Sequence, residues 1–138
     1  NKLNTIVFEL KKINPTIQMA KDVLIRLKKE ILKIKRASLI QELKNNSDLF
    51  REGMLEVGFD LVPGEHPIIP VMLGDAKVAQ HMSARMLEEG IYVIGFSFPV
   101  VPEGKARIRT QMSATHSQSD IVRVIEVFAK VGSELGVV

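Results

Sequence analysis

The stretch VVPEGKARIRTQMSATH, residues 100–116, carries the most regular pattern in the chain. From Ala106 to Met112, small or apolar residues alternate with charged or amide ones, which is the period of a half-buried β-strand. The face expected in the core holds Ala106, Ile108, Thr110 and Met112. The opposite face holds Lys105, Arg107, Arg109 and Gln111. We therefore predict a strand over 106–112 with two arginines on its polar face.

These two arginines are the strongest chemical signal in the residues themselves. A guanidinium presents a planar fork that binds a carboxylate or a phosphate through two parallel hydrogen bonds. The pattern alone also fits, and more often accompanies, a solvated strand face with surface ion pairs. Pro99-Val100-Val101-Pro102-Glu103-Gly104, just before the strand, is predicted to be a loop stiffened by its two prolines.

The segments around this strand predict a small α+β fold. Apolar runs predict strands over 68–73 and 91–98, with Pro70 placing the first near a sheet edge or delaying its start. Helical periodicity predicts helices over 47–57, 75–89 and from 118 onward, and Ser117 with Asp120 has the form of a capping box. The order from residue 47 is α-β-α-β-β-α, which predicts a sheet with helices on one face.

The first third of the chain has a different character. Residues 1–46 contain eleven Lys or Arg and four Asp or Glu, a net charge of +7, whereas residues 47–138 have a net charge of −4. After a predicted break at Asn14-Pro15-Thr16, one apolar stripe indicates a long helix, and Asn45-Asn46-Ser47 predicts the turn that ends it. The stripe consists of Ile17, Ala20, Leu24, Leu27, Ile31 and Ile34. We predict a basic helical segment over 1–46 and an α+β domain over 47–138.

Composition excludes several functional classes. The 138 residues, 46% of them hydrophobic, suffice for one core. The absence of cysteine excludes disulfides, thiolate metal sites and a cysteine nucleophile. His66, His81 and His116 show no metal-ligand spacing, so we expect no metal and a structural role for each. No membrane is expected as a partner, because no apolar run approaches the ~18–20 residues that a spanning helix needs. No nucleic acid is expected either, because the basic segment lacks interleaved aromatic residues and a Gly-rich phosphate loop.

The stretch 100–116 resembles the C-terminal signature of the α-oxoamine synthases, a family of enzymes that use pyridoxal 5'-phosphate (PLP). The resemblance runs from about Asp48 to Val138 and is absent from residues 1–44. Segments 50–51, 58–59, 66–75 and 90–96 are similar to the members that condense glycine with acetyl-CoA. The resemblance implies the C-terminal small domain of a fold type I PLP enzyme, a homodimer when intact, mitochondrial in animals and cytoplasmic in bacteria.

The resemblance also implies roles for particular residues. Arg109 is expected to bind the amino-acid carboxylate, while Arg107 receives no firm role. The loop residues Pro99, Val100, Val101, Pro102 and Gly104 are expected to lie over the active site. The family's Schiff-base lysine and the other cofactor contacts belong to its large domain, and no lysine here has that setting. We therefore expect no cofactor-binding or catalytic residue in this chain and no activity from the chain alone.

Two other functions remain open from the sequence. The same small domain could serve as a non-catalytic interaction module, which a start codon directly before residue 1 would favour. The basic helix could bind nucleic acid, in which case binding would weaken steeply with salt.

Overall fold

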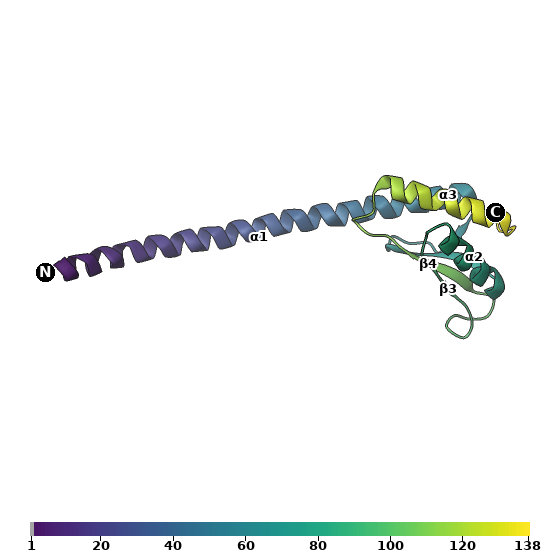
Figure 1. The fold of residues 1–138 in the computed structure, drawn as a ribbon, viewed down its shortest axis with the longest axis horizontal. Helices are drawn as coiled ribbons and strands as arrows, with labels where there is room; N and C mark the ends of the chain where they lie inside the picture. Colours follow the sequence, from purple (N-terminus) through teal and green to yellow (C-terminus); the bar gives the residue numbers. More distant parts are fainter. Residues whose placement is uncertain (1) are drawn as a thin grey trace. The chain divides into compact units, whose positions relative to one another are not determined.

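The computed structural model describes residues 2–138, with the side chains at 10, 11, 13 and 14 also left undescribed. The chain divides into two compact units, Asn1–Leu39 and Ile40–Val138. The elements are α1 (Lys2–Val57), β1 (Asp60–Leu61), β2 (Ile68–Gly74), α2 (Ala76–Glu88), β3 (Ile94–Phe96), β4 (Ala106–Gln111) and α3 (Gln118–Glu134) (Figure 1). The assignment of 1–46 and 47–138 to separate domains stays a prediction.

Helix α1 corrects two predicted breaks. It passes through Pro15. The proline removes one backbone hydrogen bond, but helix-forming residues on both sides allow the helix to continue. It also passes through Asn45-Asn46-Ser47, where a turn was predicted. Here Ser47 is buried and its hydroxyl donates to the Leu43 carbonyl at 2.7 Å, one turn back in the same helix. Ser47 is therefore an interior helical residue and not the N-cap of a second helix.

Asn46 shows why the turn prediction failed. Its side chain is 3% exposed, and its Nδ2 donates to the carbonyls of Ser113 and His116, both at 2.9 Å. An asparagine that favours a turn in isolation is thus held in a helix by a loop about 70 residues away in sequence. Tertiary hydrogen bonds outweigh the local propensity of the residue.

The four strands form one antiparallel sheet in the order β1-β2-β4-β3. Two predicted strands differ in extent, since β3 covers only 94–96 of the expected 91–98 and β4 ends at Gln111. β1 was not predicted, because two residues carry no readable alternation. The order is therefore α-β-β-α-β-β-α.

Pro70 lies in the middle of β2, which has β1 on one side and β4 on the other, so β2 is neither an edge strand nor one that starts late. Its carbonyl accepts from the Val62 N–H at 3.2 Å, just past the end of β1 at Leu61. The nitrogen of Pro70 faces that same side. No ladder hydrogen bond is lost there, because β1 has already ended.

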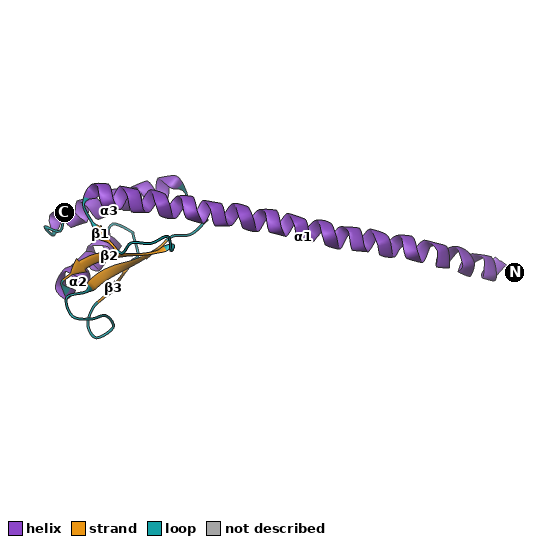
Figure 2. Ribbon diagram, turned by 180° about the vertical axis from the view of Figure 1, so that it is seen from behind, coloured by secondary structure: helices purple, strands orange, loops and turns teal. Residues whose placement is uncertain are grey.

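The sheet buries one face against the helices, as predicted (Figure 2). Ala106, Ile108, Thr110 and Met112 are all at most 8% exposed, which confirms the alternation along this segment. Ile69 and Val71 of β2 join Met82 and Met86 of α2 in the same core. α3 lies beside the C-terminal part of α1, where the Phe50 and Phe128 rings meet edge to face at 6.1 Å.

Gly95 fixes how closely β3 approaches α2. A Cβ at this position would lie 3.1 Å from the Ala79 carbonyl oxygen and 2.9 Å from the Ser83 hydroxyl. The Ala79 oxygen belongs to the helix backbone and cannot swing away, so a side chain would push the strand off the helix. The glycine therefore allows β3 to pack directly against α2.

Helices α2 and α3 begin as the sequence predicts. Asp75 caps α2 by accepting from the Lys77 and Val78 N–H groups at 2.7 and 3.1 Å. Ser117 and Asp120 form the predicted capping box at the start of α3. The Val78 and Lys77 N–H groups hold the pKa of Asp75 below its ordinary value, and the Ser117 hydroxyl and N–H do the same for the pKa of Asp120.

These lowered pKa values predict a loss of stability in acid. A carboxyl with a lower pKa in the folded state stabilises the fold above its unfolded pKa of about 4, and this contribution is lost as the pH falls through the folded value. We expect urea unfolding midpoints, followed by circular dichroism, to fall below about pH 4. Asp120→Asn should flatten this dependence, while Glu103→Gln, in the exposed loop, should preserve it. An unchanged pH profile in Asp120→Asn would contradict the assignment.

Candidate functional site

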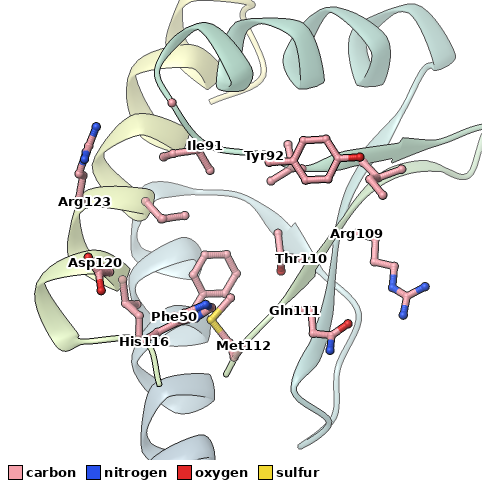
Figure 3. Close-up of a pocket in the computed structure, with 15 residues that line it drawn as sticks. Phe50, Ile91, Tyr92, Arg109, Thr110, Gln111, Met112, His116, Asp120 and Arg123 are labelled. Carbon is pink, nitrogen blue, oxygen red and sulfur yellow. The ribbon is translucent and has the colours of Figure 1, made fainter. Parts of the chain in front are cut away.

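A pocket of about 550 Å³ opens in the unit Ile40–Val138 (Figure 3). Its walls come from β4, from the segment between α2 and β3, and from the start of α3. Phe50 of α1 contributes to its floor. The lining residues are Phe50, Gly90, Ile91, Tyr92, Val93, Ile94, Arg109, Thr110, Gln111, Met112, His116, Asp120, Ile121, Arg123 and Val124.

Strand β4 supplies the wall that carries Arg109. Arg109 stands opposite Ile94 of β3 and Pro70 of β2 in the sheet register. Its neighbour Thr110 points into the core, where its hydroxyl donates to the Ile69 carbonyl at 2.7 Å. Because side chains alternate along a strand, anchoring Thr110 inward turns Arg109 outward. Arg109 makes no hydrogen bond or ion pair with another described residue, so its guanidinium is free to bind a ligand.

The two arginines of the polar face are separated by the structure. Arg107 stands opposite Phe96 and Met72 and does not line the pocket, whereas Arg109 does. Sequence alternation alone placed both on one face. The position of the pocket along β4 distinguishes them.

The segment 90–93 forms the upper wall in Figure 3, and a helix-end motif sets its direction. Gly90 has φ +82° and donates to the Leu87 carbonyl at 2.9 Å, while the Ile91 N–H donates to the Met86 carbonyl at 2.8 Å. This pair of bonds is a Schellman motif, which needs the left-handed conformation that glycine adopts freely. Tyr92, 76% exposed, follows at once, with its hydroxyl toward the Arg109 side.

The wall opposite Arg109 carries His116, Asp120 and Arg123 (Figure 3). The His116 Nδ1 accepts from the Ser113 N–H at 3.3 Å, which holds the ring against its own loop. Asp120 is occupied by the capping box. The Arg123 Nη2 donates to the Glu89 carbonyl at 3.4 Å and so links α3 to the end of α2.

The loop Pro99–Gly104 is not part of this pocket. None of its residues is among the lining residues, and Val101 is buried at 7% exposure while Val100 is 71% exposed. The Val100 and Val101 N–H groups both donate to the Ser97 carbonyl, which folds the loop into a turn. Its expected place over an active site stays a prediction.

The remaining candidates lie apart. The His66 Nδ1 accepts from the Ile68 N–H at 3.1 Å beside β2, and His81 is exposed on α2. Among residues 2–138 no three His, Asp or Glu side chains gather as a metal site. No helix described in this range is long and apolar enough to cross a bilayer.

Sequence reasoning missed Tyr92 and Arg123 as pocket residues. Tyr92 lay within a stretch expected to be a strand, and its exposure depends on the turn that Gly90 makes. Arg123 lies on the polar face of an amphipathic helix, a position that periodicity assigns to solvent. Only the packing of α3 beside the end of α2 brings Arg123 to the pocket.

The pocket combines a small apolar floor with cationic side chains at its edges, which suits a small carboxylate or other anion. PLP needs an amine to form its bond with the protein. The lysines described in the unit 40–138 are Lys44, Lys77, Lys105 and Lys130, and none lines the pocket. Lys44 pairs with Asp48 and Lys130 with Glu89, both at 2.7 Å. This pocket therefore lacks the lysine that a covalent bond to PLP requires.

Comparison with protein families finds one match, to aminotransferase class I and II, over residues 14–128. The match begins well before Asp48, so it corrects the expectation that the likeness is confined to the C-terminal two thirds of the chain.

Several relatives are similar at the sequence level. The chain is 52% identical to the 2-amino-3-ketobutyrate coenzyme A ligase of Escherichia coli K12 over 102 residues, 74% of this chain and 26% of that protein. It is also 52% identical over 95 residues to the human mitochondrial protein of that name, covering 69% and 23%. The 8-amino-7-oxononanoate synthase of Symbiobacterium thermophilum is 46% identical over 99 residues, covering 72% and 25%. The chain thus spans about a quarter of the length of these relatives.

Solved structures are similar in fold. A high-resolution structure of SPT with the PLP internal aldimine superposes with a TM-score of 0.69 and 29% identity, covering 71% of this chain and 25% of that one. The Sphingomonas wittichii serine palmitoyltransferase gives a TM-score of 0.68 and 28% identity over the same share of each chain. These likenesses establish the α+β small-domain fold.

Proposed function

The chain belongs to the aminotransferase class I and II family, and we propose that it is the C-terminal small domain of a glycine C-acetyltransferase, a PLP-dependent acyltransferase that joins glycine and acetyl-CoA. The observation that carries this proposal is the 52% identity to the coenzyme A ligases, in a chain whose Arg109 borders a pocket. The intact enzyme would be a homodimer, as the family resemblance implies.

In this function the chain supplies substrate recognition. Arg109 would bind the glycine carboxylate through its two parallel N–H groups, and the position of Arg109 on the outward face of β4 leaves both available. A guanidinium also selects against substrates that lack a carboxylate, since its charge would then be left without a counterion. The apolar floor beneath it would keep water from the reacting end of the substrate.

The cofactor would come from elsewhere in the intact enzyme, because no lysine lines the pocket. The large domain that the family resemblance implies would hold PLP. The compartment would follow the source, as the human relative is named mitochondrial and the bacterial one is not.

A chimera tests the proposal. In the E. coli relative, the stretch that aligns with this chain would be replaced by the 102 aligned residues of this chain. We expect the chimera to release coenzyme A from acetyl-CoA in a glycine-dependent manner. The matched control carries the aligned stretch of the S. thermophilum synthase in the same position, and it should favour a different acyl donor or amino acid. A folded, PLP-loaded chimera without glycine-dependent turnover would refute the proposal.

The chain by itself is expected to form no specific bond with PLP. The pocket lacks a lysine amine, and an amine at the cofactor aldehyde is what the bond requires. After incubation with PLP and reduction with borohydride, mass spectrometry should find only sparse labelling spread over many lysines. A stoichiometric adduct at one lysine, protected by added glycine, would show that a cofactor site exists within this chain.

A second candidate is a non-catalytic interaction module built on the same small domain. The exposed apolar residues of α1 favour it. The chimera distinguishes the enzyme domain from the interaction module, because a non-catalytic module would not restore turnover.

A further inference from the structure

Helix α1 carries an apolar seam with a coiled-coil repeat. We define the heptad seam as the residues spaced alternately by three and four along this helix: Ile17, Ala20, Leu24, Leu27, Ile31 and Ile34. In the sequence the same spacing continues toward the N-terminus through Leu3, Ile6, Leu10 and Ile13. An unbroken alternation of this length is the pattern of positions a and d in a coiled coil.

The heptad seam is exposed along its length. Its leucine and isoleucine residues keep between 48% and 69% of their surface accessible. Soluble proteins rarely leave a contiguous apolar stripe of this kind in water, and a heptad stripe matches the interface of another helix better than it matches a flat surface.

The charges beside the seam indicate which helix fits it. With Leu24 and Ile31 at position a, Lys21, Lys28 and Lys35 all fall at position e and Glu30 at position g. In a parallel pair, Glu30 of one copy lies next to Lys35 of the other, so the flanking charges attract. In an antiparallel pair the e positions face each other, and the three lysines of each copy would repel.

Two further features fit this arrangement. Pro15 falls at position f, on the side of the helix away from the seam, so its ring does not enter an interface. Ser38 and Gln41 occupy the next two seam positions, so the apolar repeat ends close to the boundary of the two units at Leu39 and Ile40.

We propose that the heptad seam binds the same seam of a second copy of this chain, in a parallel coiled coil. The seam residues precede the unit that holds the pocket but lie within residues 14–128 of the family match, so the proposal concerns this chain apart from the rest of an intact enzyme. It predicts an oligomer of the isolated chain whose stability depends on the seam residues and not on the pocket.

A matched pair of variants tests the interface. Leu27 lies on the seam at position d, and Leu32 lies outside it at position b; both are exposed, at 53% and 65%. Sedimentation equilibrium of the full chain should give a mass of at least two chains. Leu27→Glu should weaken the association by roughly 100-fold or more, whereas Leu32→Glu should leave it nearly unchanged.

Single cysteines test whether the two helices run parallel or antiparallel. The chain has no native cysteine, so each introduced thiol can pair only with its counterpart in another copy. Ile17→Cys and Ile31→Cys each place a thiol at position a. In a parallel coiled coil each residue faces its own counterpart at a distance that a disulfide can span, so both variants should form dimers under mild oxidation. An antiparallel pair could link at most one of them.

Three results would overturn the proposal. The first is a monomeric chain at concentrations of tens of micromolar. The second is an oligomer whose mass Leu27→Glu leaves unchanged, which would place the interface in the other unit. The third is a monomer that co-sediments with phosphatidylserine vesicles, which would assign the apolar and basic surface of α1 to a lipid bilayer.

Discussion

Replacing Arg109 by alanine in the active chimera is expected to lower kcat/KM for glycine by a factor of roughly 30 to several thousand. The variant would remove a charge-assisted pair with the glycine carboxylate and leave that carboxylate without a partner at the edge of the pocket. Arg109 borders the pocket and makes no hydrogen bond or ion pair with another described residue. The lost activity is therefore expected to reflect lost ligand binding. Steady-state kinetics with glycine varied at saturating acetyl-CoA measures it.

Two variants control for charge and for position. Arg109→Lys should recover only part of the loss, because an ammonium is a point charge and cannot make two parallel bonds. Arg107→Ala removes an equal charge from the same strand but from outside the pocket, so its effect on KM for glycine should be small. A large rise in KM for Arg107→Ala, together with normal kinetics for Arg109→Ala, would show that the roles are reversed.

Replacing Phe128 by alanine is expected to destabilise the unit Ile40–Val138 by about 3–5 kcal/mol. Phe128 is fully buried, and its ring meets Phe50 at 6.1 Å and Phe59 at 5.7 Å, both edge to face. The substitution removes the ring that joins α3 to α1 and to the segment before β1, and leaves a cavity among rigid neighbours. A loss of this size is a large part of the stability of an ordinary domain.

Urea unfolding followed by circular dichroism measures this effect, at one fixed protein concentration because self-association would add to the apparent stability. Phe128→Leu should cost less, since it fills part of the cavity. Val122→Ala, on the exposed side of the same helix, should change stability by no more than about 0.5 kcal/mol. A cost below about 1 kcal/mol for Phe128→Ala would mean that the ring is not central to this core.

The elements that could be predicted are those whose signal is local. Alternation from Ala106 to Met112 located β4 and its buried face, because side-chain direction in a strand follows from the backbone alone. The caps at Asp75 and Ser117 were predictable since the capping side chain bonds within three residues of itself. The apolar stripe of α1 was also visible, because the spacing of apolar residues by three and four is read directly from the sequence.

The elements that were mispredicted depend on distant partners. The sequence around Asn46 and Ser47 favours a turn, yet α1 continues because Asn46 bonds to a loop about 70 residues later and Ser47 bonds back into the helix. Pro70 favours a strand edge, yet β2 lies between β1 and β4, and the proline is tolerated because it faces the side on which β1 has just ended. At Asn46 a tertiary contact outweighs the residue's intrinsic preference, and at Pro70 the extent of the neighbouring strand decides.

By itself, the sequence determined the α+β class, the outward face that carries Arg107 and Arg109, and the likeness to PLP-dependent acyl-transferring enzymes. Which of the two arginines borders a pocket was decided only by the tertiary structure. A strand's period places residues i and i+2 on one face without ranking them, and the pocket arises where β4 meets the turn at Gly90 and the start of α3. Tyr92 and Arg123 join it there because packing, and not spacing along the chain, sets the distance between those elements.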